Sequence, residues 1–376
     1  MSSKYIIPEG TRDLILGECK NKKKLQEKIE KVLDKWGYKE VVTPTIEFYQ
    51  TFNSGFQNLK EEEVYKFFDG KGRILVLRPD MTIPIARVVA TKFKDKNLPL
   101  RFRYSSDVFR SHKSLGGKRN EYTDCGIELI GLNNEESDLE VLVTALDALE
   151  LIKNKEYKLE IGNMDFYRSA IESLNLNEEQ EDELATLIDR KSLKELEDYL
   201  VELNVSNEYK DFFLELPWLF GGKEVLDKAK KYSFNDGIKK SINYLEKLYD
   251  ELSQLGYGDV VTFDLGMIPR LNYYTGITFR GFVDGVGANV LSGGRYDKLI
   301  ATFGCDVPAI GFSVNLDTLI EEIDFVDESQ EKYVITYGEN NKIQAIKECK
   351  KLQKQDKVVE LVPVKGNADI EIKKEV

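Results

Sequence analysis

The stretch RFRYSSDVFRSHKSLGGKRNEYTDCGIELIG, residues 101–131, decides the fold that the sequence predicts. Aromatic, aliphatic and β-branched residues fill its two ends, whereas glycines and basic residues fill its middle. This pattern predicts two strands, 101–110 and 121–131, joined by a basic loop that contains Gly116 and Gly117. Such a loop turns tightly, and its cations suit a phosphate or a carboxylate.

The second strand of this stretch has one acidic face. Side chains alternate across a strand, so Asp124, Gly126 and Glu128 share a face, and the apolar residues between and beyond them lie on the other. Two carboxylates beside a glycine leave an open floor for a small ligand with cationic or hydrogen-bonding groups. Alternatively, the carboxylates pair across strands with Arg101 or Arg103 and form a solvated sheet face.

The chain on either side of this stretch predicts an α+β domain. Short turns rather than regular crossover helices join most of the predicted strands, which favours a mainly antiparallel sheet. An amphipathic helix is predicted over 20–36, where apolar residues recur at helical spacing before Gly37. Acidic, leucine-rich segments predict a helical insertion at about 166–255. The further strands are predicted at 38–44, 73–77, 157–162, 259–265, 273–282 and 287–291.

A chain of 376 residues favours a large domain and a smaller one. We expect the first domain to span 1–325 and the second 326–376, with the acidic segment 324–332 as a linker. The last part of the chain predicts a small α/β unit, whose order is strand 332–339, helix 340–355, strand 358–363 and strand 369–374.

Composition excludes several classes of protein. A formal net charge of -12 has the wrong sign for a dedicated nucleic-acid binder. The four cysteines have no paired spacing, which argues against a zinc site and for a reducing compartment. No signal-peptide pattern and no run of about 20 apolar residues is present, so we expect a cytoplasmic protein with no membrane contact.

Six sequence motifs, one of which contains the acidic face, occur in order along most of the chain. They are PEGTRDL (8–14), GYKEVVTP (37–44), LRPDMT (77–82), the unit from Phe109 to Glu128, YYTG (273–276) and GGRYDKL…PAIGFSVNLDTL (293–319). In order and spacing this set resembles the catalytic domain of histidyl-tRNA synthetases. The resemblance implies a class II aminoacyl-tRNA synthetase fold, in which an antiparallel sheet is flanked by helices. It also implies that the 20–44 unit lies near a dimer interface.

The resemblance also implies a pocket for histidine. Its counterparts in this chain are Asp80, Thr82, Arg110, Asp124, Glu128, Tyr273, Tyr274 and Tyr296. Two of them depart from the family pattern, because Asp80 stands where the family usually has glutamate and Asp124 where it has glutamine. A shorter carboxylate and an added charge change geometry and affinity, but the preference for a small cationic zwitterion remains.

The side of the pocket that would bind ATP differs more strongly from the family pattern. Where the family has glutamate and arginine respectively, this chain has His112 and Pro269. Asn272 replaces an aspartate, and Asp317 and Thr318 stand at a motif that normally ends in glutamate and arginine. Each lost donor to a developing charge costs about 10² to 10³ in rate. We therefore expect no catalytic residues and no cofactor.

With a retained amino-acid pocket and an altered ATP side, the chain resembles the histidyl-tRNA synthetase-like regulatory subunits of ATP phosphoribosyltransferase. The resemblance implies a non-catalytic subunit required for the first step of histidine biosynthesis, with a short-form catalytic subunit as partner and L-histidine as effector. It also implies a homodimer within a hetero-oligomer. Because the C-terminal segment is truncated relative to an anticodon-binding domain, we expect no tRNA binding.

Two alternatives remain open at the level of sequence. The chain could be a divergent histidyl-tRNA synthetase or a tRNA-independent amino-acid-activating enzyme, in which Arg270 and His112 replace the missing groups. It could also be a dimeric scaffold whose pocket is vestigial.

Overall fold

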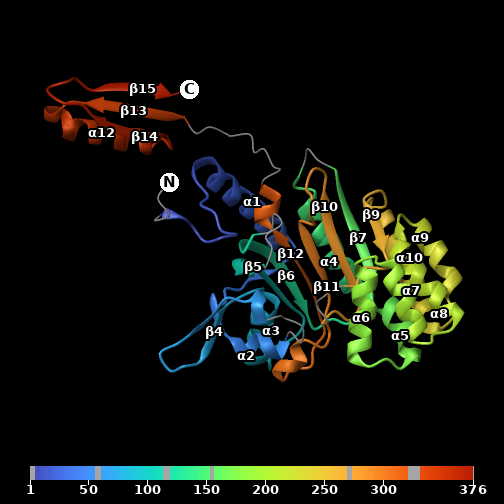
Figure 1. Cartoon of the computed structure of the whole chain (residues 1–376). Coiled ribbons are helices and arrows are strands. Elements are labelled where there is room, and N and C mark those ends of the chain that lie inside the picture. The colour runs from blue at the N-terminus through green and yellow to red at the C-terminus, as the bar shows by residue number, and fades with distance from the viewer. Residues whose placement is uncertain are drawn as a thin grey trace. The chain divides into compact units, whose positions relative to one another are not determined.

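The computed structural model describes residues 5–55, 61–112, 119–152, 156–268, 273–320 and 331–375. The chain forms two compact units, which divide between Ile323 and Asp324 (Figure 1). No helix among the described residues is long and apolar enough to cross a membrane.

A nine-stranded sheet organises the first unit, and all neighbouring strands in it are antiparallel except the pairs β1·β5 and β7·β9. The predicted α+β class with a mainly antiparallel sheet is therefore confirmed. In spatial order the strands are β1 (Lys39–Glu40), β5 (Leu100–Phe109), β6 (Glu121–Ile130), β12 (Ala309–Asn315), β11 (Leu291–Arg295), β10 (Ile277–Val283), β7 (Tyr157–Asn163), β9 (Val261–Asp264) and β8 (Phe220–Gly221).

The quoted stretch forms the strand pair β5·β6. Tyr104 pairs with Gly126 and Phe102 with Glu128, so the acidic face of β6 lies on the same side as these two aromatic side chains. Arg101 and Arg103 pair with Leu129 and Ile127 and lie on the opposite face. There Arg101 binds Glu140 and Arg103 binds Asp34. The alternative prediction, that the carboxylates of the acidic face pair across strands with these arginines, is therefore wrong.

Two helices cover the face of the sheet away from the acidic residues. Helix α1 (Leu16–Lys35) buries Leu25, Ile29 and Leu33, and it contacts α4 (Glu135–Leu149) and strands β5 and β6. Gly37 follows α1 with φ +82°, a left-handed conformation that favours glycine and ends the helix as predicted.

On the acidic side, α2 (Tyr49–Gly55), α3 (Thr82–Lys92) and a small antiparallel sheet surround an apolar core. The small sheet has the order β2 (Ile46–Phe48), β4 (Ile74–Leu77) and β3 (Lys66–Phe68). Phe52, Val76 and Ile83 are fully buried there with Tyr104 of β5. This packing fixes the start of α3 beside the acidic strand.

The predicted helical insertion lies between β7 and β9, and Figure 1 shows it beside these strands at one end of the sheet. It contains α5 (Met164–Ile171), α6 (Glu178–Asp189), α7 (Leu193–Glu202), α8 (Asn207–Glu215), α9 (Glu224–Ala229) and α10 (Asp236–Gln254). Helix α10 packs against α5 through an apolar stripe that includes Ile238, Ile242 and Leu245. The short helix α11 (Leu316–Leu319) directly follows β12.

The second unit is the small α/β segment that the sequence predicts. Its sheet has the order β14 (Val358–Pro363), β13 (Lys332–Tyr337) and β15 (Glu371–Glu375), and α12 (Lys342–Gln353) packs on it. Ile335, Ala345 and Cys349 form its buried core.

Several local predictions are wrong. The strand predicted at 287–291 begins only at Leu291 and continues to Arg295, because residues 285–290 form the turn that leads into it. The strand predicted from 273 begins at Ile277, so Tyr273 and Tyr274 lie before it. The strand predicted at 38–44 is reduced to two residues, and β2, β3 and β12 have no predicted counterpart.

Candidate functional site

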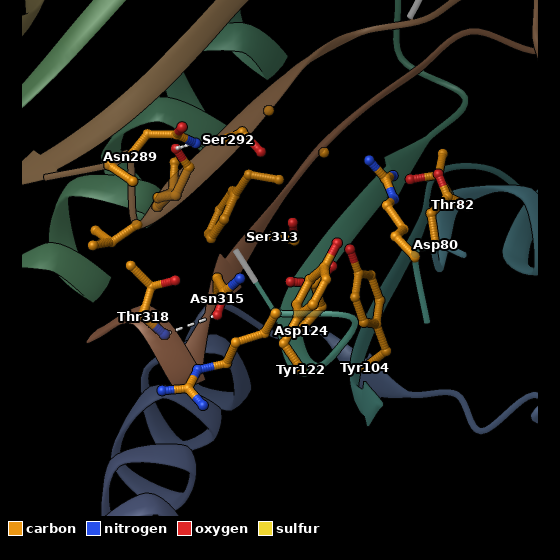
Figure 2. A pocket seen from close by; sticks show the side chains of 18 of the residues that line it. Asp80, Thr82, Tyr104, Tyr122, Asp124, Asn289, Ser292, Ser313, Asn315 and Thr318 are labelled. Atoms are coloured by element: carbon orange, nitrogen blue, oxygen red, sulfur yellow. Dashed lines mark hydrogen bonds between the residues drawn. The ribbon is translucent and has the colours of Figure 1, made fainter. Parts of the chain in front are cut away.

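The eight residues predicted to bind a ligand all line one cavity, which has a volume of about 700 Å³. The cavity lies over the central strands β5, β6, β12 and β11, so segments far apart in the chain contribute to it. Figure 2 shows Asp80 and Thr82 on one side of it and Asn289, Ser292 and Thr318 on the other. Residues 113–118 of the basic loop, and Pro269, Arg270 and Asn272, lie outside the described residues.

Glu128 is the most deeply buried acid of the cavity, with 1% of its surface exposed. Thr82 donates its hydroxyl to one carboxylate oxygen at 2.9 Å, and the Tyr296 hydroxyl donates to the other. Gly311 of β12 lies directly opposite, and a Cβ at that position would lie 1.9 Å from Glu128 Oε2. The carboxylate is thus held in one orientation, and glycine is required beside it.

Asp80 and Arg110 form a second polar group at the same end. Asp80 accepts a hydrogen bond from the Ile83 N–H at the start of α3, at 3.2 Å. Arg110, just after β5, donates its Nε to the Pro79 carbonyl at 2.8 Å, which holds the guanidinium next to the Asp80 segment. Asp124 completes this group from β6, with 9% of its surface exposed.

Burial shifts the ionisation of all three carboxyl groups in the same direction. Loss of hydration raises the pKa of Asp80 to about 6, that of Asp124 to about 7 and that of Glu128 to about 8. Arg110 lowers the first two pKa values in part, and the hydroxyls of Tyr296 and Thr82 lower the third in part. At this acidic end, Arg110 therefore offsets only part of the desolvation of the carboxyl groups.

Aromatic side chains line part of the cavity. The Tyr273 ring lies 4.7 Å from the Tyr274 ring and 5.8 Å from the Tyr296 ring, measured between centroids. Arg168 of α5 donates to the Tyr274 carbonyl at 2.7 Å, so the helical insertion holds this turn in place.

The opposite end of the cavity is lined mainly by neutral polar groups, namely Asn289, Ser292, Ser313, Asn315 and Thr318. Thr318 donates its backbone N–H to the Asn315 side chain at the start of α11. Asp317, next to Thr318 in the chain, accepts from Lys22 at 2.7 Å and lies 3.6 Å from Arg12. Asp317 also accepts the Thr123 N–H of β6 at 2.8 Å. Arg119 and His112 are the basic side chains that line the cavity besides Arg110, among the residues described.

Sequence reasoning missed several residues of this cavity. Tyr104 and Tyr122 line it, and strand alternation could have found both, because Tyr104 pairs with Gly126 and Tyr122 lies two residues before Asp124. Ser313 and Ser292 could not be found in this way because their strands were not predicted at those positions. Over the described ranges, no group of three or more His, Cys, Asp or Glu side chains could hold a metal ion.

Comparisons with known proteins agree with this geometry. A family model described as histidyl-tRNA synthetase matches residues 10–319. An ATP phosphoribosyltransferase regulatory subunit of Acetivibrio thermocellus is 41% identical over 95% of this chain and 87% of its own length. One of Clostridium acetobutylicum is 38% identical over 95% of this chain and 89% of its own length.

A solved structure gives the same result in three dimensions. The crystal structure of an ATP phosphoribosyltransferase regulatory subunit/histidyl-tRNA synthetase from Bacillus halodurans matches with a TM-score of 0.86 and 30% identity. The match covers 97% of this chain and 94% of that chain. The chain therefore belongs to the histidyl-tRNA synthetase family, within the group of ATP phosphoribosyltransferase regulatory subunits.

Proposed function

We propose that this chain is a non-catalytic regulatory subunit that binds L-histidine at the acidic end of the cavity and acts on a short-form ATP phosphoribosyltransferase catalytic subunit. The observation that carries this proposal is the acidic end itself. Three buried carboxyl groups and Arg110 converge there beside aromatic side chains. The family supplies the partner, because relatives over most of the chain are named as regulatory subunits of that enzyme.

The donors and acceptors of the acidic end suit histidine. The ammonium group and the ring N–H of histidine donate hydrogen bonds, and carboxylates are the strongest acceptors for them. Arg110 offers a cation to the ligand's carboxylate, and the rings of Tyr273, Tyr274 and Tyr296 offer an apolar wall for the imidazole.

The neutral end supports the absence of amino-acid activation. Adenylate formation develops charge on phosphate oxygens and needs positioned cations. Thr318 stands where the family places an arginine, and Asp317 binds Lys22 and Arg12 instead. We therefore expect no ATP–pyrophosphate exchange with histidine and no charging of tRNA.

Under this proposal, histidine inhibits the catalytic subunit by binding to this chain, and no reaction of histidine is needed. A ligand shifts a complex only if it binds two conformations with different affinity. Feedback of ordinary strength needs a coupling of about 1–3 kcal/mol, and by linkage the enzyme's substrates must then weaken histidine binding. The Arg168 bond to the Tyr274 carbonyl gives one physical connection from the cavity to the insertion.

The test is reconstitution from purified subunits. Phosphoribosyl transfer by the short catalytic chain is measured with and without this protein, over a range of histidine concentrations. We expect activity to rise on addition of this protein and to become inhibitable by histidine. A Ser292→Ala variant at the neutral end serves as the matched control and should behave as wild type. Equal activity and equal insensitivity with and without this protein would refute the proposal.

We also propose that the chain forms a homodimer through the small sheet, whose first strand follows directly in sequence on the 20–44 unit that is predicted to lie near the interface. Ile46 and Phe48 of β2, Phe67 of β3 and Leu75 and Leu77 of β4 share one face by register. The first three have 47%, 42% and 36% of their surface exposed, an apolar patch typical of an interface. Sedimentation should give a dimer for wild type and a monomer for an Ile46→Lys/Phe48→Lys variant, with Val201→Lys, another exposed apolar residue, as control. A monomeric wild type would contradict this.

A further inference from the structure

A second cavity, with a volume of about 560 Å³, lies where the helical insertion meets the sheet. Helices α5 and α10 supply most of its lining, and Asn163 at the end of β7 and Glu135 at the start of α4 supply the rest. Every described residue that lines it, apart from Gly237, has a polar or charged side chain, and none of them lines the first cavity. This lining suits a polar ligand, separate from the ligand of the first cavity.

Hydrogen-bond donors gather where the end of α5 lies beside the start of α10. Asn235, the N-cap of α10, donates its side-chain amide to the Ser169 carbonyl at 2.8 Å, and its side-chain oxygen accepts the N–H of Ile238 at 2.8 Å. The N–H of Gly237 belongs to the first turn, so it has no partner inside the helix. A Cβ on Gly237 would lie 2.3 Å from Ser169 Oγ. Glycine therefore leaves this N–H and the Ser169 hydroxyl close together and uncovered by a side chain.

Ser241, one turn after Gly237 on α10, adds a donor without a partner. The residue lines the cavity and is 4% exposed, and its hydroxyl has no hydrogen-bond partner among the residues described. A buried hydroxyl without a partner is costly, and rotation about its single χ1 torsion can turn it towards a ligand. Lys240 lies next to it in the cavity lining and supplies an ammonium group. A first-turn N–H, two hydroxyls and an ammonium group at the start of a long helix suit a phosphoryl group.

Acceptors line the cavity beside these donors. Asp165 lies one turn before Ser169 on α5, which is about 6 Å along the helix axis. Its carboxylate and the amide of Asn243 on α10 can accept hydrogen bonds from hydroxyl groups. The other acid of the lining, Glu135, is bound by Lys247, which compensates its charge. A small sugar bridges the separation between the donors around Gly237 and the Asp165 carboxylate.

We propose that this second cavity binds a small phosphorylated sugar, with the phosphoryl group at the donors around Gly237 and the sugar hydroxyls at Asp165. The ammonium group of Lys240 compensates the charge of the phosphoryl group, and the Ser241 hydroxyl gains the partner that it lacks in the empty cavity. This site is distinct from the proposed histidine site, so its occupancy can be measured whether or not histidine binds.

Calorimetric titration of ribose 5-phosphate, inorganic phosphate and ribose into the full chain tests the site. Ribose 5-phosphate should bind, inorganic phosphate should bind at least about fivefold more weakly, and ribose should give no measurable binding. Lys240→Gln should weaken the binding of ribose 5-phosphate at least about fivefold, whereas Lys239→Gln, at the neighbouring position outside the lining, should bind as wild type. Histidine affinity should be the same in both variants, because neither lysine lines the first cavity.

Ser241→Ala separates binding from folding. It should weaken the binding of ribose 5-phosphate about fivefold without lowering the stability of the ligand-free protein, because the hydroxyl that it removes has no partner. Ser253→Ala is the matched control, since Ser253 also lies on α10 with a buried, unpartnered hydroxyl but does not line the cavity. Absence of binding by both phosphate compounds, or binding that neither Lys240→Gln nor Ser241→Ala weakens, overturns the proposal. Equal affinity for ribose 5-phosphate and inorganic phosphate overturns the assignment of a sugar.

Discussion

The two ends of the cavity share a sheet but differ in how their polar groups are satisfied. At the acidic end, Glu128 is 1% exposed and receives two hydroxyl donors, and Arg110 is fixed by a backbone carbonyl. At the neutral end, Ser292 and Thr318 face the cavity with uncharged hydroxyls (Figure 2). The acidic end holds its charged groups in fixed positions, whereas the neutral end has Thr318 where the family pattern has an arginine.

Under the proposed function, this difference separates recognition of a ligand from chemistry on it. Ligand recognition needs a few buried groups held in place, whereas phosphoryl chemistry also needs cations aimed at a developing charge. Near the neutral end, Lys22 and Arg12 bind Asp317, and that carboxylate also accepts the Thr123 N–H of β6. These cations thus join α1 and the N-terminal segment to the sheet.

The largest effect expected is the loss of the glycine beside Glu128. In Gly311→Ala, the new Cβ would lie 1.9 Å from Glu128 Oε2 and 2.3 Å from the Ile127 carbonyl oxygen. Because one of these atoms is backbone, the strands must shift, and we expect a destabilisation of about 3 kcal/mol with loss of histidine binding. Gly287→Ala is the matched control, since nothing lies within 4 Å of its Cβ. Chemical denaturation that finds equal stability in both variants would contradict this.

The second largest effect is expected on histidine affinity, without a change in the fold. Glu128→Gln keeps the shape of the side chain but removes the charge, so histidine affinity should fall by about 2 kcal/mol. The same titration with Ser292→Ala should show no change, because that hydroxyl lies at the other end. Unchanged affinity in Glu128→Gln would place histidine elsewhere.

The stability of the ligand-free protein should fall as pH rises from 5.5 to 8.5. The native pKa values of Asp80, Asp124 and Glu128 exceed the value of about 4 expected for the unfolded chain, so the native state binds more protons in this range. The free energy of unfolding then decreases with pH, by at least about 1 kcal/mol. Denaturation at several pH values measures it.

An Asp80→Asn/Asp124→Asn variant should show a flatter dependence, and saturating histidine should also reduce the loss at high pH. A wild-type stability that increases across this range would mean that the carboxyl groups are ionised and well stabilised in the empty cavity.

The smallest effect is expected at the neutral end. Thr318→Arg restores one family residue, yet Asp317 next to it remains bound to Lys22 and offers no catalytic group. We expect no ATP–pyrophosphate exchange and a change in histidine affinity below about 0.5 kcal/mol. Exchange activity in this variant would show that a single cation separates the chain from an enzyme.

The sequence by itself determined the features that depend on local periodicity. Alternation along residues 121–131 placed Asp124 and Glu128 on one face, and Gly37 marked the end of α1. The strand, helix, strand and strand of the second unit were likewise predicted with boundaries close to those observed. Each of these patterns involves neighbours within a few residues.

Tertiary structure alone decided which distant segments meet. Thr82 and Tyr296 reach Glu128 from 46 and 168 residues away, and β12, which sequence did not predict, brings Gly311 against it. Register also decided that Arg101 and Arg103 face Glu140 and Asp34 rather than the acidic residues. The physical reason is that alternation fixes the faces of one strand, whereas strand order and register depend on packing across the whole sheet.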